Sequence, residues 1–272
     1  MQLAFTTYST PQWSLERIAE QGAALGYQAV ELRMYDGHDV PADLTQAQCA
    51  EVRRTFTSRG LPICAVGTSC RFSGPDEARM NQVASARQYI AIAAAMGAPI
   101  LRVFGGAYEA GVSPQQAAGR VAAALSELAD AAAASGVRLA LETHDAFAAA
   151  ALVGQVMRQV VHPAVGACWD WLHPFRVGET ASEAFAHLRG RILHTHTKDA
   201  RKDAEGRWEA APLGKGDLPL REILAALVSS GYDGPLSLEW EPRGHDSHPE
   251  TALAQYAEAM RALCAEVGAR LG

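Results

Sequence analysis

Cysteines are few and unpaired in this sequence. Among 272 residues there are five, and none forms the close pairs of a zinc ribbon or a redox motif. No histidine or aspartate pattern around them suggests an activated nucleophile. We therefore expect reduced thiols that pack in the core, and neither a disulfide-stapled scaffold nor a thiol enzyme. The five are Cys49, Cys64, Cys70, Cys168 and Cys264.

An excess of positive charge and a long apolar run are also missing. The formal net charge is −6, so nothing attracts the chain as a whole to nucleic acid. The Ala-rich stretches are interrupted by Glu, Arg and Asp, and MQLAFTTYS has no charged-then-apolar leader, so neither membrane insertion nor export is indicated. We expect a cytoplasmic protein that acts on a small molecule and has no nucleic-acid or membrane partner.

No Pro/Ser-rich linker divides the chain, and TTYSTPQW (6–13), after the first β-rich run, lacks the glycines of a dinucleotide-binding turn. Short β-rich runs instead alternate with long Ala-, Leu-, Glu- and Arg-rich runs, which is typical of βα units on a parallel sheet. Eight such units without a break favour a closed barrel over an open doubly wound sheet. The predicted fold class is therefore α/β, as a single (β/α)8 TIM barrel over residues 1–272.

The positions of these units follow from the same pattern. Strands are expected at residues 2–7, 29–34, 62–67, 100–105, 138–143, 164–170, 191–197 and 236–241. Helices are expected at 14–25, 44–59, 76–96, 114–135, 147–158, 180–188, 219–230 and 250–268. Five helices are followed by a glycine that would end them, namely Gly26, Gly60, Gly97, Gly136 and Gly231.

Ionisable residues occur at the ends of four consecutive predicted strands. In a parallel barrel these ends surround the active site, so the side chains should meet at one rim. Burying charges there is costly unless they pair with each other or bind a cation. Each residue taken singly is an ordinary ion-paired or hydrogen-bonded rim residue, and only the joint pattern favours a shared metal. The residues are Glu142 and His144, then Asp170 and His173, then His194, His196 and Lys198, then Glu239 and Glu241.

One residue from each strand makes an oxygen-rich set with a single imidazole, which suits Mn²⁺ or Mg²⁺ and also admits Zn²⁺ or Co²⁺. Glu239 is preferred to Glu241 because it sits deeper and continues the alternation, which leaves Glu241 as a solvated or ion-paired end. His194, one step below His196, is interpreted as a hydrogen-bonded support residue.

Six short motifs carry a family resemblance that runs over the whole chain. They are VELR (30–33), RVFGG (102–106), LETH (141–144), the DxxH in WDWLH (169–173), HTKD (196–199) and LSLEWE (236–241). Together they resemble the xylose-isomerase-like barrel superfamily, in particular the sugar isomerase/epimerase branch that includes ketose 3-epimerases, hydroxypyruvate isomerase and inosose dehydratase.

The resemblance implies specific roles. The divalent metal would be held by Glu142, Asp170, His196 and Glu239, and the two glutamates would also act as the acid/base pair on opposite faces of the substrate. His173 would hydrogen-bond a substrate oxygen. Such a site removes a proton next to a carbonyl, because the cation stabilises the enediolate that forms.

Other substrate contacts are expected with alternatives. Arg102 and Lys198 would contact a polar substrate group, or would instead neutralise Glu31 or Asp199. Trp13 and Phe72, on strand-to-helix loops, would wall the pocket or simply pack locally. PLGKGDLPL (212–220) lacks the spacing of a phosphate-binding loop, and we interpret Asp217 as a helix N-cap.

Several functions are compatible with this site. The first is a metal-dependent isomerase or epimerase of a small sugar or keto acid. The second is a lyase that dehydrates an inosose or a dehydroshikimate-like ring, and the third is a non-catalytic sugar-binding barrel. Endonuclease IV shares the superfamily, but AVGTSCRF (65–72) and RVFGGAY (102–108) lack the histidines its extra metals need, which argues against a nuclease. A homodimer or homotetramer is compatible with the sequence.

Overall fold

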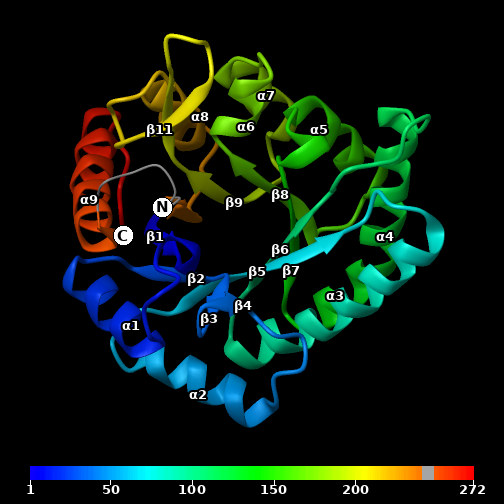
Figure 1. Ribbon diagram of the computed structural model, residues 1–272, viewed down its shortest axis with the longest axis horizontal. Helices are drawn as coiled ribbons and strands as arrows, with labels where there is room; N and C mark the ends of the chain where they lie inside the picture. The colour runs from blue at the N-terminus through cyan, green and yellow to red at the C-terminus, as the bar shows by residue number, and fades with distance from the viewer. Residues whose placement is uncertain (241–247) are drawn as a thin grey trace.

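A closed barrel of eight parallel strands forms the centre of the computed structural model, which describes residues 1–240 and 248–272 (Figure 1). Around the barrel the strands follow the order β1, β12, β9, β8, β7, β6, β5, β2, and each neighbouring pair is parallel. The predicted (β/α)8 barrel is confirmed. The strands are β1 (Gln2–Thr6), β2 (Ala29–Leu32), β5 (Ile63–Arg71), β6 (Ile100–Phe104), β7 (Arg138–Glu142), β8 (Val165–Asp170), β9 (Ile192–Thr197) and β12 (Pro235–Leu238).

Helices form a ring outside these strands, and α9 lies beside β1 so that the two ends of the chain meet (Figure 1). The α-helices are α1 (Leu15–Ala24), α2 (Gln46–Thr57), α3 (Asp76–Met96), α4 (Pro114–Ala134), α5 (Ala150–Gln159), α6 (Leu172–Arg176), α7 (Ala181–Leu188), α8 (Leu220–Ser229) and α9 (Pro249–Glu266). Short 3-10 turns occur at η1 (Thr7–Ser9) and η2 (Asp145–Phe147). In residues 1–240 and 248–272, no helix is both long and apolar enough to cross a membrane.

Local sequence signals explain where the helices begin and end. At the start of α4, the Ser113 side chain accepts from the Gln116 amide while the Gln116 side chain accepts from the Ser113 amide, with Pro114 at the first helical position. All five glycines predicted to end helices have φ between 70° and 74°, a left-handed conformation that favours glycine.

Two small hairpins and a short helix were not predicted. The hairpins are β3 (Met34–Tyr35) with β4 (His38–Asp39), and β10 (Asp199–Lys202) with β11 (Trp208–Ala211). The helix, α6, precedes the expected α7. Strand β12 ends at Leu238, so the expected strand is shorter than predicted: Glu239 and Trp240 lie outside it. Glu241, which was expected to end the strand, lies outside the described residues.

The glycine-containing loop before α8 corrects the interpretation of Asp217. Pro219 occupies the N-cap position of α8 without a side-chain cap, and the Asp217 carboxylate accepts instead from the Lys202 amide at 2.9 Å. The amides of Gly214 and Gly216 both donate to Asp199 Oδ2 at 2.9 Å. The loop therefore binds a carboxylate of its own chain, which fixes the segment that follows β9.

The inside of the barrel changes from small residues to charged ones. Ala4, Ala29, Ala65, Ile100 and Ala140 belong to one small buried cluster, which also includes Cys168. Two positions further along four of these strands, toward their C-terminal ends, the side chains are buried and ionisable, namely Glu31, Arg102, Glu142 and Asp170. All five cysteines are free and buried, as predicted.

Candidate active site

Four side chains converge at the C-terminal ends of the strands, as the sequence predicted. Glu142 ends β7, Asp170 ends β8, His196 lies in β9, and Glu239 follows directly after β12. One potential ligand atom from each lies within 4.8 Å of those of the other three. The first three side chains are fully buried, and Glu239 is 13% exposed.

The His196 ring lies between two sets of carboxylates. Its Nδ1 is 2.9 Å from Glu142 Oε1 and 3.7 Å from Glu239 Oε1, while its Nε2 is 2.9 Å from Glu31 Oε2. His194, one inward step lower on β9, also has its Nε2 3.0 Å from that Glu31 oxygen. The support role expected of His194 thus corresponds to a buried hydrogen bond.

Lys198 places its ammonium among the same oxygens. Nζ lies 2.8 Å from Asp170 Oδ2 and 2.5 Å from Glu239 Oε2. Burial alone would lower the pKa of Lys198, but Asp170 and Glu239 outweigh it and hold that pKa well above its usual value. Asp199 is engaged by backbone amides instead, so the alternative pairing of Lys198 with Asp199 is wrong.

Arg102 on β6 is buried, with only 2% of its side chain exposed. Its Nε is 3.2 Å from Glu142 Oε2 and 3.9 Å from Glu31 Oε1, and its Nη1 donates to the Thr68 carbonyl at 2.6 Å. Arg102 therefore pairs with Glu31, which was the alternative to a substrate contact in the sequence analysis. Arg102 acts below the rim, where it neutralises two buried carboxylates.

Asp170 and His173 form one local unit. Asp170 Oδ1 accepts from the amides of Leu172 and His173 at 2.8 and 3.1 Å, which fixes the start of α6. The His173 ring packs edge-on against His144, with ring centroids 4.4 Å apart. Burial lowers the pKa of His173, so the ring is neutral at neutral pH, and its Nε2 has no hydrogen-bond partner in the described part of the chain.

The carboxylates remain ionised although they are buried. Burial would raise the pKa of each, but neighbouring basic groups lower it below its usual value. The largest lowering contributions come from His196 for Glu31 and Glu142, and from Lys198 for Asp170 and Glu239.

The charge of this site fits a divalent cation. Glu142 Oε2 and Asp170 Oδ2 are buried and face cationic groups, Arg102 Nε at 3.2 Å and Lys198 Nζ at 2.8 Å. Four carboxylates face two strong cations and the His196 ring, whose pKa burial would lower but the surrounding acidic groups hold well above its usual value. A metal ion bound by that ring would displace its proton and leave two negative charges, which a divalent ion would balance. The carboxylates are those of Glu31, Glu142, Asp170 and Glu239, and the cations are Arg102 and Lys198.

The family model of the xylose isomerase-like TIM barrel matches residues 19–265. The chain belongs to this family. No curated protein matches the sequence, but solved structures of the same barrel do. A D-psicose 3-epimerase in the presence of D-fructose is 18% identical, with 98% of this chain and 100% of that chain covered and a TM-score of 0.79. An IOLI protein with a bound zinc atom is 20% identical, with 98% and 99% covered and a TM-score of 0.84.

A third similar structure is described as a probable 3-DHS dehydratase, AsbF, involved in petrobactin synthesis in Bacillus anthracis. It is 20% identical, with 96% of this chain and 99% of that chain covered and a TM-score of 0.75. At these identities the similarity establishes the shared fold.

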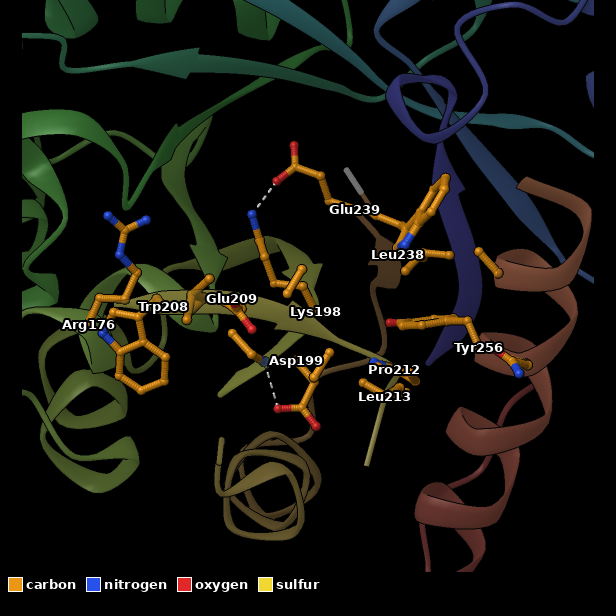
Figure 2. Close-up of a pocket in the computed structure, with 17 residues that line it drawn as sticks. Arg176, Lys198, Asp199, Trp208, Glu209, Pro212, Leu213, Leu238, Glu239 and Tyr256 are labelled. Atoms are coloured by element: carbon orange, nitrogen blue, oxygen red, sulfur yellow. Dashed lines mark hydrogen bonds and ion pairs between the residues drawn. The ribbon is translucent and has the colours of Figure 1, made fainter. Parts of the chain in front are cut away.

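A pocket adjoins the cluster of this xylose isomerase-like barrel (Figure 2). Lys198 and Glu239 form part of its wall, and Trp208 of the β10–β11 hairpin and Tyr256 of α9 form other parts. Trp13 and Phe72 are not among the described residues that line it. Phe72 is fully buried in the hydrophobic core, and Trp13 is 7% exposed with its ring beneath the Arg17 guanidinium. Both side chains therefore pack locally, which was the alternative to lining the pocket.

Sequence reasoning did not assign a site role to Glu31 or Trp208. Glu31 lies in the VELR motif of β2, but its position opposite β9 depends on barrel closure, which strand alternation does not reveal. Trp208 belongs to a hairpin whose short strands show no alternation of buried and exposed positions and so give little periodic signal.

Proposed function

We propose that this chain is a metal-dependent isomerase or epimerase that acts on a small sugar or keto acid by proton abstraction through an enediolate. The observation that carries the proposal is the convergence of two glutamates on one imidazole. Glu142 and Glu239 come from β7 and β12, which are separated around the barrel by β8 and β9, so the carboxylates approach from different directions. Two carboxylates so arranged can take a proton from a carbon and deliver one to it.

The metal would be held by Glu142, Asp170, His196 and Glu239. When bound, a divalent ion would polarise the substrate carbonyl and adjacent hydroxyl and stabilise the charge of the enediolate. The carboxylate-rich set supports Mn²⁺ or Mg²⁺, and Zn²⁺ or Co²⁺ also fit one imidazole among oxygens.

Three side chains would transfer protons or bind the substrate. Glu142, ionised and held by His196 and Arg102, is a base ready to accept the carbon-bound proton. Glu239 exchanges protons at the other face, and the contact with the Lys198 ammonium holds its carboxylate in place. The unpartnered Nε2 of His173 is placed to hydrogen-bond a substrate oxygen.

The test is a panel of ketoses and keto acids incubated with the Mn²⁺-loaded protein in D₂O. Proton abstraction predicts deuterium at the reacting carbon, detected by mass spectrometry. We expect Glu142→Gln and Glu239→Gln each to lower turnover about 100-fold or more. Glu258→Gln, which changes an exposed residue on α9, should leave turnover unchanged. A protein that binds no divalent metal, and whose two glutamine variants keep full activity, would refute the proposal.

A dehydratase is the second candidate, and the position of Lys198 favours it. An ammonium held between Asp170 and Glu239 can donate a hydrogen bond to a departing hydroxyl and stabilise the negative charge that develops on its oxygen. The solved structure titled a probable 3-DHS dehydratase has the same fold. Loss of one water from the product mass distinguishes this reaction from isomerisation, and turnover by the isolated chain excludes a purely sugar-binding barrel.

A further inference from the structure

Glu31 is a fully buried carboxylate that gathers three donors on one oxygen. Oε2 lies 3.0 Å from His194 Nε2, 2.9 Å from His196 Nε2 and 3.1 Å from the Ser237 hydroxyl, which donates to it. An ionised carboxylate only accepts hydrogen bonds, so both imidazoles must present an Nε2–H to it. Glu31 therefore keeps a proton on Nε2 of both rings, so that only Nδ1 of His196 can give up its proton to a metal ion.

The contact with Glu31 also sets the orientation of the His196 ring. With Nε2–H committed to Glu31, Nδ1 is the nitrogen that faces Glu142 and Glu239. A metal held by the carboxylates would therefore be bound through Nδ1. A carboxylate on the remote nitrogen of a ligating histidine orients the ring and makes it a stronger ligand.

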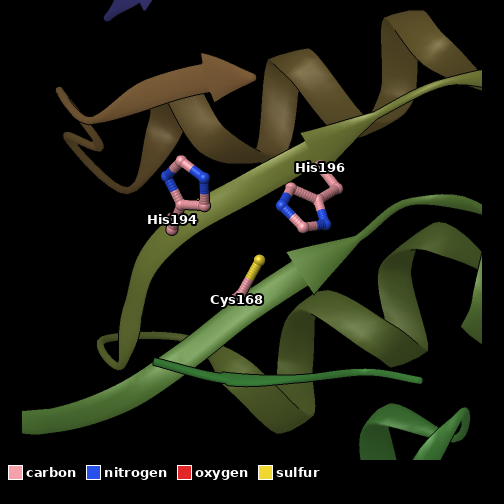
Figure 3. Close-up of side chains that lie close together, drawn as sticks. All are labelled: Cys168, His194 and His196. Carbon is pink, nitrogen blue, oxygen red and sulfur yellow. The ribbon is translucent and has the colours of Figure 1, made fainter. Parts of the chain in front are cut away.

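A second group of potential ligands competes for the same ring. Cys168 on β8 lies next to His194 and His196 on β9, and one ligand atom from each lies within 4.8 Å of the others (Figure 3). A thiol with two imidazoles suits thiophilic ions such as Zn²⁺ and Co²⁺. His196 belongs to both groups. The nitrogen through which its ring binds a metal ion therefore decides which group holds the ion.

The position of Glu31 is itself fixed by its surroundings. Gly67 on the neighbouring β5 has no side chain, and a Cβ there would lie 3.0 Å from Glu31 Oε1 and 2.8 Å from Arg102 Nη2. Arg102 in turn has its Nε 3.9 Å from Glu31 and 3.2 Å from Glu142. Gly67 thus leaves the space that Glu31 and Arg102 occupy, and turning the carboxylate away from the histidines would weaken its ion pair with Arg102.

We propose that Glu31 is a positioning residue that commits His196 to the four-residue site through Nδ1 and thereby keeps a metal ion away from Cys168. The inference rests on the proposed function, because it requires a metal at Glu142, Asp170, His196 and Glu239. Glu31 itself does not touch the metal or the substrate.

The experiment is a titration of the metal-free protein with Co²⁺, followed by visible and near-ultraviolet absorption. The wild-type protein should bind Co²⁺ without a thiolate-to-cobalt charge-transfer band, and Cys168→Ala should leave the spectrum unchanged. Glu31→Gln should weaken Co²⁺ binding about 10- to 100-fold. Ser237→Ala is the matched control, because it removes one donor to the same oxygen and leaves both histidine contacts, so its affinity should stay within about 3-fold of wild type.

The wild-type protein alone provides an independent readout if Glu31→Gln does not fold. Nitrogen-15 spectra of its histidine rings, recorded with Zn²⁺ bound, should show His196 metal-bound at Nδ1 and protonated at Nε2. Binding through Nε2, or a charge-transfer band that Cys168→Ala abolishes, would overturn the proposal.

The remaining outcomes separate this proposal from the function. If Glu31→Gln binds Co²⁺ as tightly as the wild type, or if Ser237→Ala loses as much affinity, the positioning role fails and the proposed enzyme stands. If the wild-type protein binds neither Co²⁺ nor Mn²⁺, both fail together.

Discussion

Lys198 supplies a cation to the oxygens that are proposed to hold a metal. Removing one partner of a buried ion pair leaves uncompensated charge and costs about 3–5 kcal/mol. Since Lys198 contacts both Asp170 and Glu239, we expect Lys198→Met to lower the free energy of unfolding of the metal-free protein by about this amount. Mn²⁺ should restore most of the loss, because it would neutralise the same carboxylates. Urea unfolding with and without Mn²⁺ measures both effects.

The control for this change is Lys215→Met, at an exposed lysine of the loop before α8. It should alter the free energy of unfolding by no more than about 0.5 kcal/mol, with or without metal. A loss at Lys198 that Mn²⁺ does not reduce would show that the lysine and the metal do not share their oxygens.

The sequence identified the four residues of the cluster because alternation along a strand and the position of its C-terminal end both leave a clear pattern. Glu142, Asp170 and His196 required no other information. The pairing of Glu31 with His194 and His196 was not predicted, because the two histidines are 163 and 165 residues from Glu31 along the chain and only barrel closure brings them together.

Two glycines inside helices make a matched pair with opposite expectations. Gly119 in α4 has open surroundings, since the nearest atom to an added Cβ is Gln159 Oε1 at 3.9 Å. Gly154 in α5 faces α7, and its Cβ would lie 2.8 Å from the His187 carbonyl oxygen. We expect Gly119→Ala to stabilise the protein by about 0.5–1 kcal/mol through helix propensity. Gly154→Ala should destabilise it by about 1–3 kcal/mol through overpacking between the helices.

Thermal unfolding of both variants beside the wild type checks this pair. If Gly154→Ala also stabilised the protein, the contact between α5 and α7 would not depend on the missing side chain of Gly154; if Gly119→Ala destabilised it, the surroundings of Gly119 would not be open.

Secondary-structure elements differed in how far the sequence revealed them. The eight barrel strands and their helices were predictable because burial imposes a periodic pattern and glycines mark the helix ends. The hairpin β10–β11 was not, because its strands have four residues each and their buried and exposed positions do not alternate. The Asp217 interpretation was wrong for a related reason, since the partner of that carboxylate lies in the unpredicted hairpin.

The interior charge pattern connects the fold to the proposed metal. Mostly small side chains fill the barrel below the charged residues, so its stability there depends on close packing. At the C-terminal ends of the strands, in the upper part, stability depends instead on balancing carboxylates against Arg102, Lys198 and the histidines. A divalent ion bound to the upper part would therefore stabilise the whole folded chain, because the four ligands come from strands that are brought together only by barrel closure.

This gives a test that needs no substrate. At a Mn²⁺ concentration about 100 times the dissociation constant, the wild-type protein should gain about 2.7 kcal/mol in free energy of unfolding, and a chelator should reverse the gain. Asp170→Asn keeps an Oδ1 acceptor for the start of α6 but removes a ligand charge, so the dependence on Mn²⁺ should be largely lost. Asp233→Asn, at an exposed position before β12, should keep it. Equal stabilisation of Asp170→Asn and the wild type would place the bound ion away from this cluster and remove the physical basis for an enediolate mechanism there.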